Sequence, residues 1–205
     1  MTLLKQKFLI IKLSSIGDIV HALPFLRTLR KNYPKAYIAW IIEESFQDLI
    51  KCNPDLDEVI PIPTKNWRKN LNTKSWDEIC KTRKLLKERR FDWTFDLQGL
   101  IKTGVIARTT GALNRVGFHR NNCREKINTW FNNKQSEYLS SGSHIVNRCL
   151  SQLSALGNFH PQTEFTISIS AEDECISEDF IKKNNKLAER PIAGINPGAG
   201  FPTKL

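Results

Sequence analysis

Close to the N-terminus the sequence reads Phe8-Leu-Ile-Ile-Lys-Leu-Ser-Ser-Ile-Gly-Asp-Ile-Val-His21. The apolar run at 8–13 is typical of a buried parallel strand, and the apolar spacing over 18–32 predicts a helix. Ligands of open α/β sheets bind outside the carboxyl ends of the strands, so the turn between these elements is a candidate site. Four small or polar residues occupy that turn: Ser14, Ser15, Gly17 and Asp18.

The same turn also has a purely structural interpretation. Its spacing matches neither G-x-G-x-x-G nor a glycine loop that ends in Lys-Ser/Thr, so neither phosphate-binding signature applies. Asp18 can be a helix N-cap and Gly17 a turn residue. Ser14 and Ser15 can hydrogen-bond to the neighbouring backbone. From the residues alone, the structural and the chemical roles both stay open.

The charge balance indicates an anionic partner. The chain has 205 residues, of which 31 are Lys or Arg and 21 are Asp or Glu, giving a net charge of +10. Nucleic acid, a phosphorylated substrate or an anionic membrane face would each suit this excess, and a solvated basic surface explains part of it. Because no run approaches 18 apolar residues and no signal-peptide pattern is present, we expect a cytoplasmic protein.

The cysteines and histidines are widely spaced along the chain, so we expect free thiols and no metal site. The cysteines are Cys52, Cys80, Cys123, Cys149 and Cys175, and the histidines are His21, His119, His144 and His160.

Strand and helix patterns alternate, which predicts an α/β protein with a parallel sheet and right-handed crossovers. Two basic segments, 64–74 and 115–126, are expected as loops. The predicted strands are 8–13, 36–43, 58–62, 91–97 and 113–118. The predicted helices are 18–32, a short one from Glu43, 75–90, one from Gln98 to Arg108, 143–156 and 172–187. A last strand, 191–196, leads into a Gly-rich turn, as at the start of a second βα domain.

Several motifs resemble those of the lipopolysaccharide heptosyltransferases, glycosyltransferase family nine. Lys12-Leu-Ser-Ser-Ile-Gly-Asp-Ile-Val-His-Ala-Leu-Pro24 is similar to the family's N-terminal motif, and Phe95-Asp-Leu-Gln-Gly-Leu-Ile-Lys102 to its second. Trp67-Arg-Lys69 and Arg124-Glu125 resemble its basic acceptor segments. Asn196-Pro-Gly-Ala-Gly-Phe-Pro-Thr-Lys204 resembles the first loop of its C-terminal domain. Asp-Leu-Gln-Gly-Leu together with Trp-Arg-Lys resembles heptosyltransferase I most.

The resemblance implies a GT-B fold, in which two Rossmann-like domains with doubly wound parallel sheets face each other across a cleft. Residues 1–157 would be the acceptor-binding domain, 158–170 a linker, and 171–205 the truncated start of the donor domain. The implied activity is inverting transfer of L-glycero-D-manno-heptose from ADP-heptose to the Kdo sugar of lipid A-core. It implies no metal cofactor, and it implies action at the cytoplasmic face of the inner membrane. Because only the start of the donor domain is present, we expect this chain to be inactive by itself.

The resemblance also assigns roles to residues. Asp18 matches the proposed base, which takes the proton of the acceptor hydroxyl. Where the heptosyltransferase I pattern has consecutive arginines before the Trp, this chain has Lys65-Asn66, so the phosphate pattern of its acceptor stays open. The implied acceptor contacts are Ser14, Ser15, Gly17, Lys65, Trp67, Arg68, Lys69, Gln98, Lys102, Arg120 and Arg124. The implied donor contacts are Thr203 and Lys204.

Two other functions compete with the enzyme. One is a non-catalytic module that binds lipid A-core or a membrane surface. The other is nucleic-acid binding, which the charge alone suggests and which no helix-turn-helix, RNP or zinc pattern supports. For each basic run, a solvated surface is the structural alternative to a binding role.

Overall fold

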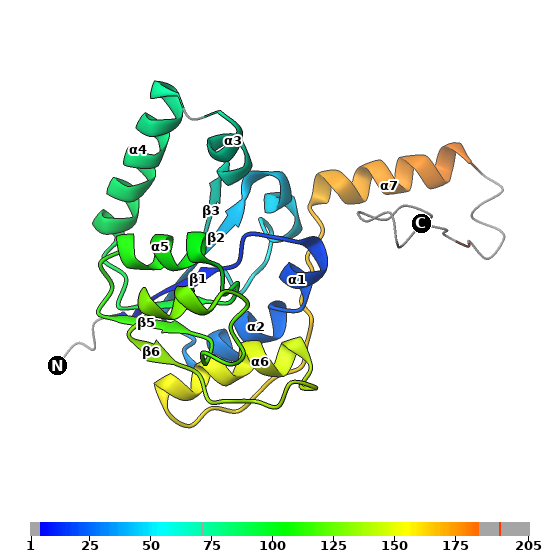
Figure 1. Ribbon diagram of the computed structural model, residues 1–205. Helices are drawn as coiled ribbons and strands as arrows, with labels where there is room; N and C mark the ends of the chain where they lie inside the picture. Colours follow the sequence, from blue (N-terminus) through cyan, green and yellow to red (C-terminus); the bar gives the residue numbers. More distant parts are fainter. Residues whose placement is uncertain (1–4, 71, 185–192, 194–205) are drawn as a thin grey trace. The chain divides into compact units, whose positions relative to one another are not determined.

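The computed structural model describes residues 5–70, 72–184 and 193, and the chain divides into two compact units, 1–168 and 169–205. The first unit contains one parallel sheet in the order β3-β2-β1-β4-β5-β6 (Figure 1). This is the Rossmann strand order, so the predicted doubly wound α/β fold is confirmed. The strands are β1 (Lys7–Ile11), β2 (Tyr37–Glu43), β3 (Glu58–Ile62), β4 (Trp93–Asp96), β5 (Asn114–Gly117) and β6 (Lys134–Gln135).

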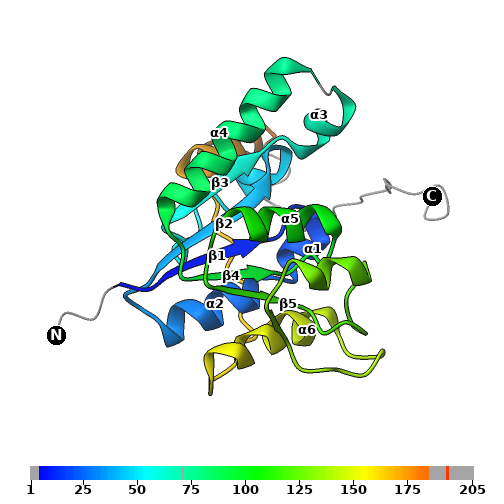
Figure 2. The ribbon, with the colours of Figure 1, turned by 60° about the vertical axis from the view of Figure 1, so that its left-hand side comes forward.

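Helices cover both faces of the sheet. Figures 1 and 2 show α4 and α5 on one face and α2 and α6 on the other. Within the described residues, no helix is both long enough and apolar enough to cross a bilayer. The helices of this unit are α1 (Ile16–Val20), α2 (Leu23–Asn32), α3 (Thr64–Lys69), α4 (Thr73–Arg89), α5 (Ile101–Thr109) and α6 (Ile145–Ser151), with 3₁₀ turns η1 (Glu44–Leu49), η2 (Lys126–Trp130) and η3 (Gln152–Leu156).

The alternation of side chains along β1 divides the core between the two faces. Phe8 and Ile10 pack into the cluster beneath α2 and α6, whereas Leu9 and Ile11 pack into the cluster beneath α4 and α5. All four side chains are fully buried, as expected for a central strand of a parallel sheet.

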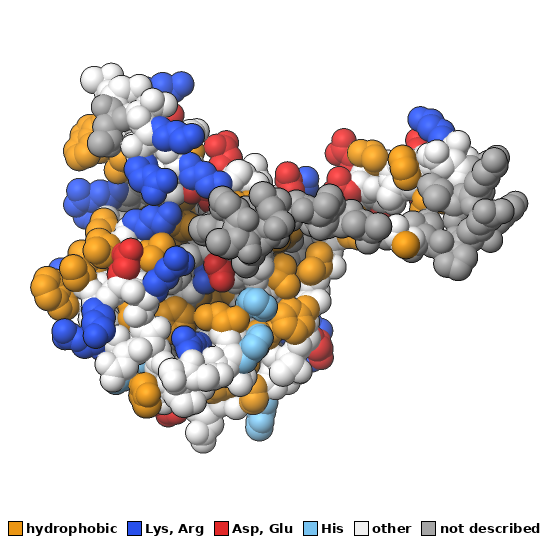
Figure 3. All heavy atoms as spheres, turned by 45° about the vertical axis from the view of Figure 1, so that its right-hand side comes forward, with side chains coloured by type: hydrophobic (Ala, Val, Ile, Leu, Met, Phe, Trp, Pro, Cys, Tyr) orange, Lys and Arg blue, Asp and Glu red, His pale blue; other side chains and the backbone are white. Residues whose placement is uncertain are grey.

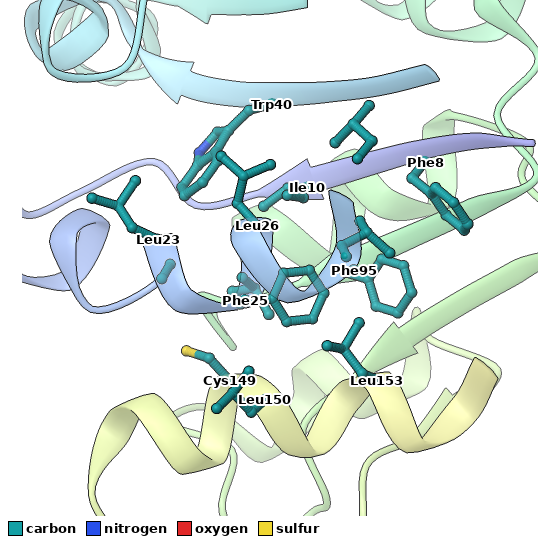
Figure 4. Packing of buried hydrophobic residues seen from close by; sticks show 14 of the residues in the cluster. Phe8, Ile10, Leu23, Phe25, Leu26, Trp40, Phe95, Cys149, Leu150 and Leu153 are labelled. Atoms are coloured by element: carbon teal, nitrogen blue, oxygen red, sulfur yellow. The ribbon is translucent and has the colours of Figure 1, made fainter. Parts of the chain in front are cut away.

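Aromatic side chains fill the cluster beneath α2 and α6, as Figure 4 shows. The Phe95 ring meets the Phe25 ring edge-on at 5.1 Å and lies 6.2 Å from the Phe8 ring. Trp40 is fully buried on β2, and its indole N–H donates to the carbonyl of Lys12 at 3.0 Å. This last bond fixes the chain where it leaves β1.

The predicted single helix over 18–32 is wrong, because the chain forms two helices, α1 and α2. Pro24 lies in the first turn of α2. A proline further into a helix lacks the N–H that the backbone ladder needs, and its ring meets the carbonyl four residues earlier. The helix therefore stops after Val20 and restarts at Leu23.

The predicted loop over 64–74 is also wrong, since Thr64–Lys69 is the helix α3 and α4 begins at Thr73. The carboxylate of Glu43 accepts hydrogen bonds from the Thr64 hydroxyl and, at 3.0 Å, from the Lys65 backbone N–H. An anion at this position stabilises a helix N-terminus. The capping group thus comes from the end of β2, which a local sequence pattern does not reveal.

Other predicted boundaries shift by a few residues. The segment 115–126 includes the end of β5 before its loop, and β6, a two-residue strand, was not predicted. The helix predicted over 143–156 begins later, as α6 at Ile145, and is capped by His144, whose Nδ1 accepts from the Val146 N–H at 3.3 Å. Gly157 ends the helical segment with a φ of 104°, a backbone conformation that favours glycine.

The expected linker over 158–170 is hydrogen-bonded to the first unit as far as Thr166. Gln162 N–H donates to the Thr28 hydroxyl at 2.9 Å, and Asn53 donates to the Thr166 carbonyl at 2.7 Å. In the second unit, α7 (Ala171–Lys183) is capped by Ser170, with acidic residues in its first turn. The predicted strand over 191–196 lies outside the described residues apart from Ala193.

Candidate active site

The strand order reverses between β1 and β4, and side chains tie the two loops that leave these strands together. Gln98 Oε1 accepts from the backbone N–H of Leu13 at 3.1 Å and of Ser14 at 3.4 Å. In the opposite direction, the buried Lys12 ammonium donates to the Leu97 carbonyl at 2.8 Å. Ligands of this fold bind at such a reversal, so these loops form the candidate site.

Asp96 fixes the turn that carries Gln98. Its Oδ1 accepts from the N–H groups of Gln98 and Gly99 at 3.0 and 3.1 Å. Its Oδ2 accepts from the Thr103 hydroxyl at 2.9 Å and from the Asn128 amide at 2.5 Å. Burial raises the pKa of Asp96, and these four donors oppose that shift. Asp96 is therefore a buried structural carboxylate rather than a group that contacts a ligand.

Asp18 lies in the first turn of α1 and holds the residue that caps the helix. Its Oδ2 accepts from the Ser15 N–H at 3.1 Å and from the Ser15 hydroxyl at 3.3 Å. This is half of a capping box, and Ser15, not Asp18, is the N-cap. Among the described residues, Asp18 Oδ1 accepts no hydrogen bond. One oxygen is thus held in place and the other is available to a ligand.

Gly17 is not a turn residue, because it lies within α1 and has an ordinary helical φ. A Cβ at this position would meet no described atom within 4 Å. Neither backbone conformation nor crowding requires glycine here. The exposed backbone at Gly17 leaves space beside Asp18 for a ligand.

A cavity of about 610 Å³ lies between α3, α4 and α5 and reaches Ser14 at the end of β1. Four cationic side chains line it: Lys65, Arg68, Arg83 and Lys102. Lys and Arg side chains gather beside hydrophobic ones in the upper left of Figure 3. Of the predicted acceptor residues, the cavity brings together Ser14, Lys65, Trp67, Arg68 and Lys102.

The cations of this cavity influence one another. Burial lowers the pKa of Lys102, and the charges of Arg68 and Lys65 lower it further, while the carboxylates of Glu43 and Glu125 oppose the shift. An anion in the cavity would relieve this repulsion between like charges. The cavity is therefore electrostatically suited to an anionic ligand.

Trp67 is half-buried within helix α3, whereas the sequence predicted a loop at this position. Its ring packs against the cluster beneath α4 and α5, and its indole N–H donates to Glu78 Oε2 at 3.0 Å. Trp67 therefore holds α3 against α4 as well as lining the cavity.

The remaining predicted acceptor residues lie outside the cavity lining. Lys69 is exposed at the end of α3. Arg120 and Arg124 lie on the loop after β5, and Glu125 of that loop caps α5 by accepting from the Ile101 N–H at 2.6 Å. Gln98 acts through the backbone of Leu13 and Ser14. The predicted donor contacts Thr203 and Lys204 lie outside the described residues.

Three residues of the site were not predicted from the sequence: Glu43, Lys12 and Arg83. Glu43 ends β2, and the carboxyl ends of parallel strands meet at one edge, so its position was a usable signal. Lys12 carries no signal of its own, because a lysine after a strand is ordinarily solvated.

Two histidines that are distant in sequence meet beside α1. The rings of His21 and His144 contact edge-on at 5.4 Å. Within the described part of the chain, no group of three His, Cys, Asp or Glu side chains is placed to hold a metal ion.

Comparison with known proteins relates this geometry to a family. Residues 79–205, more than half of the chain, match the profile of glycosyltransferase family 9 (heptosyltransferase). The chain belongs to glycosyltransferase family 9. This family 9 chain is 32% identical over 144 residues to lipopolysaccharide heptosyltransferase 1 of Pseudomonas aeruginosa. The match covers 70% of this chain and 40% of that relative.

Two solved structures are similar to the family 9 chain. Escherichia coli heptosyltransferase WaaC with ADP-2-deoxy-2-fluoro heptose has a TM-score of 0.70 at 28% identity, covering 78% of this chain and 51% of that one. A family 9 glycosyl transferase from Veillonella parvula has a TM-score of 0.81 at 22% identity. The match covers 98% of this chain and 56% of that chain, and it supports the fold. The chain spans about half the length of the relatives it matches.

The hydrogen bonds of Asp96 predict the effect of a single substitution. Asp96→Asn replaces one acceptor oxygen with an amino group that faces the Asn128 amide. The Asn128 amide cannot turn to accept from it, because it also donates to the Leu100 carbonyl at 2.7 Å. We expect the free energy of unfolding to fall by about 1–3 kcal/mol, measured by urea denaturation. The exposed Asp77→Asn is the matched control. Equal stability of the two variants would contradict the assigned network.

Proposed function

We propose that this chain is the acceptor-binding part of an inverting heptosyltransferase of lipopolysaccharide core biosynthesis. The proposed reaction transfers heptose from ADP-heptose to a Kdo sugar of lipid A-core at the cytoplasmic face of the inner membrane. It uses no resident metal ion. Family membership supports the reaction class, and the names of the relatives support an ADP-linked heptose donor and a lipopolysaccharide acceptor.

One observation carries the proposal: a cation-lined cavity reaches Ser14 at the end of β1, four residues before Asp18, whose Oδ1 accepts no hydrogen bond from the described residues. Ser14 lines the cavity, and the adjacent Ser15 is hydrogen-bonded to Asp18. An acceptor bound through its anionic groups would thus lie close to a carboxylate. Kdo and lipid A phosphates are anions, which Arg and Lys side chains bind well.

In the proposed mechanism, Asp18 Oδ1 takes the proton from the acceptor hydroxyl as that oxygen attacks the anomeric carbon of the heptose. The bonds from Ser15 to Oδ2 orient the carboxylate, so that little reorganisation is needed at the moment of reaction. Arg68 and Lys102 would hold the acceptor's anionic groups. The leaving ADP would be stabilised by the donor domain.

The proposed role of Asp18 predicts a loss of turnover. In a chimera that joins this chain to the C-terminal half of the P. aeruginosa relative, Asp18→Asn should lower kcat by roughly 10²–10⁴-fold and leave the acceptor KM within a few-fold. The unmodified chimera is the positive control, and residues 1–205 alone should bind acceptor without turnover. A variant kcat close to that of the unmodified chimera would restore the purely structural role of Asp18.

The cavity cations predict a loss of affinity. Arg68→Ala should weaken binding of a deacylated, phosphorylated Kdo-lipid A saccharide to residues 1–205 by about tenfold, because a charge-assisted hydrogen bond is lost. Isothermal titration calorimetry measures this affinity. Lys84→Ala, an exposed change on α4 outside the cavity, is the control. If both variants bind alike, the acceptor's anions bind elsewhere.

The same titration separates the other candidate functions. Tight binding of the saccharide without turnover by the chimera would favour the non-catalytic binding module. Salt-dependent binding of DNA in place of the saccharide would favour a nucleic-acid-binding protein.

A further inference from the structure

The cavity between α3, α4 and α5 has mostly apolar walls, which an anionic sugar does not explain. Its volume of about 610 Å³ is typical of sites for organic ligands, which range over about 300–1,000 Å³. A polar saccharide that lay against the apolar part of the lining would lose hydrogen bonds to water and gain none there. The apolar part of the lining consists of Ile62, Trp67, Ile79, Leu86, Val105 and Ile106.

Some of these apolar side chains are packed into the core, whereas others are left in contact with water. Leu86 is buried in the cluster beneath α4 and α5, and Trp67 and Ile106 pack against the same cluster. In contrast, the Val105 side chain is 43% exposed on α5. A hydrocarbon placed in the cavity would remove this apolar surface from water, which is favourable.

The positive charges that line the cavity favour a negatively charged ligand. Lys65, Arg68, Arg83 and Lys102 all line it. The nearby carboxylates are already engaged: Glu43 with the start of α3, Glu78 with the Trp67 indole and Glu125 with the Ile101 N–H. A neutral or cationic amphiphile would leave the four cations without counter-charge.

The geometry points to a binding site for the hydrocarbon chain of an anionic amphiphile. The hydrocarbon chain of the ligand lies among Trp67, Leu86 and Ile106. Its anionic head group is held by Arg68 and Lys102. The amphiphile is an acylated, phosphate-bearing lipid, an assignment that rests on the proposed function. The cavity would then recognise an acyl chain of the acceptor in addition to its sugar and phosphates.

A series of alkyl phosphates tests this site directly. Butyl, hexyl and octyl phosphate, kept below their micelle concentrations, are titrated into residues 1–205 by calorimetry, with inorganic phosphate as the head-group control. Each fully buried methylene strengthens binding by up to about fourfold, so the affinity should rise by about tenfold or more from butyl to octyl phosphate. Affinity that does not change with chain length would overturn the site.

Two variants in the cavity lining and one control outside it locate the effect. Thr82 lines the cavity on α4, so Thr82→Trp should fill it and abolish the dependence on chain length while phosphate binding persists. Thr73→Trp, on the same helix but outside the lining, should leave the dependence intact. Val105→Thr keeps the side-chain shape but replaces one methyl group with a hydroxyl, so it should reduce the gain per methylene while preserving the fold at this 43% exposed position. Unchanged behaviour in both Thr82→Trp and Val105→Thr would place the hydrocarbon elsewhere.

Two further ligands separate this inference from the proposed function. Octyl glucoside should bind much more weakly than octyl phosphate, and equal affinity would contradict the role of the cations. If the deacylated acceptor saccharide binds but chain length has no effect, the acyl site is wrong and the proposed function stands. If octyl phosphate binds with the expected dependence and the saccharide does not bind, the site stands and the proposed acceptor is wrong.

Discussion

One side-chain oxygen, Gln98 Oε1, joins the two loops on which the candidate site depends. The N–H of Leu13 lies just beyond β1 in a buried position, where a missing partner would cost free energy. Gln98 supplies that partner from the loop after β4, and Asp96 holds the Gln98 backbone. The positions of Ser14 and of the α1 N-terminus therefore depend on a turn more than eighty residues away in sequence.

The cavity follows from a second contact between distant segments. Glu43 at the end of β2 stabilises the first turn of α3 and thereby places Lys65 and Arg68 opposite Lys102 of α5. Gathering these like charges is unfavourable: burial is the main cause that lowers the pKa of Lys102, and the charges of Arg68 and Lys65 lower it further. A bound anion offsets that repulsion, so the arrangement that costs stability in the free protein contributes affinity in the complex.

The parts of the fold and of the site that can be predicted from the sequence are those that depend on local residue patterns. The buried runs and their alternation with helices were sufficient for the parallel sheet, and the motif around Asp18 located the turn after β1. The break between α1 and α2 was also predictable, since Pro24 cannot lie deep in a helix. Helix α3 was not predictable, because its cap comes from Glu43. The packing of Trp67 was hidden for the same reason, since its partner Glu78 lies on α4.

The most direct test of this account maps where the acceptor binds. Amide chemical shifts of isotope-labelled residues 1–205 would be followed by NMR during titration with the deacylated, phosphorylated Kdo saccharide. The account predicts that the largest changes occur at Ser14, Lys65, Arg68 and Lys102, around the cavity and the end of β1. Changes confined to the loop of Arg120 and Arg124, or to the face covered by α2 and α6, would contradict it.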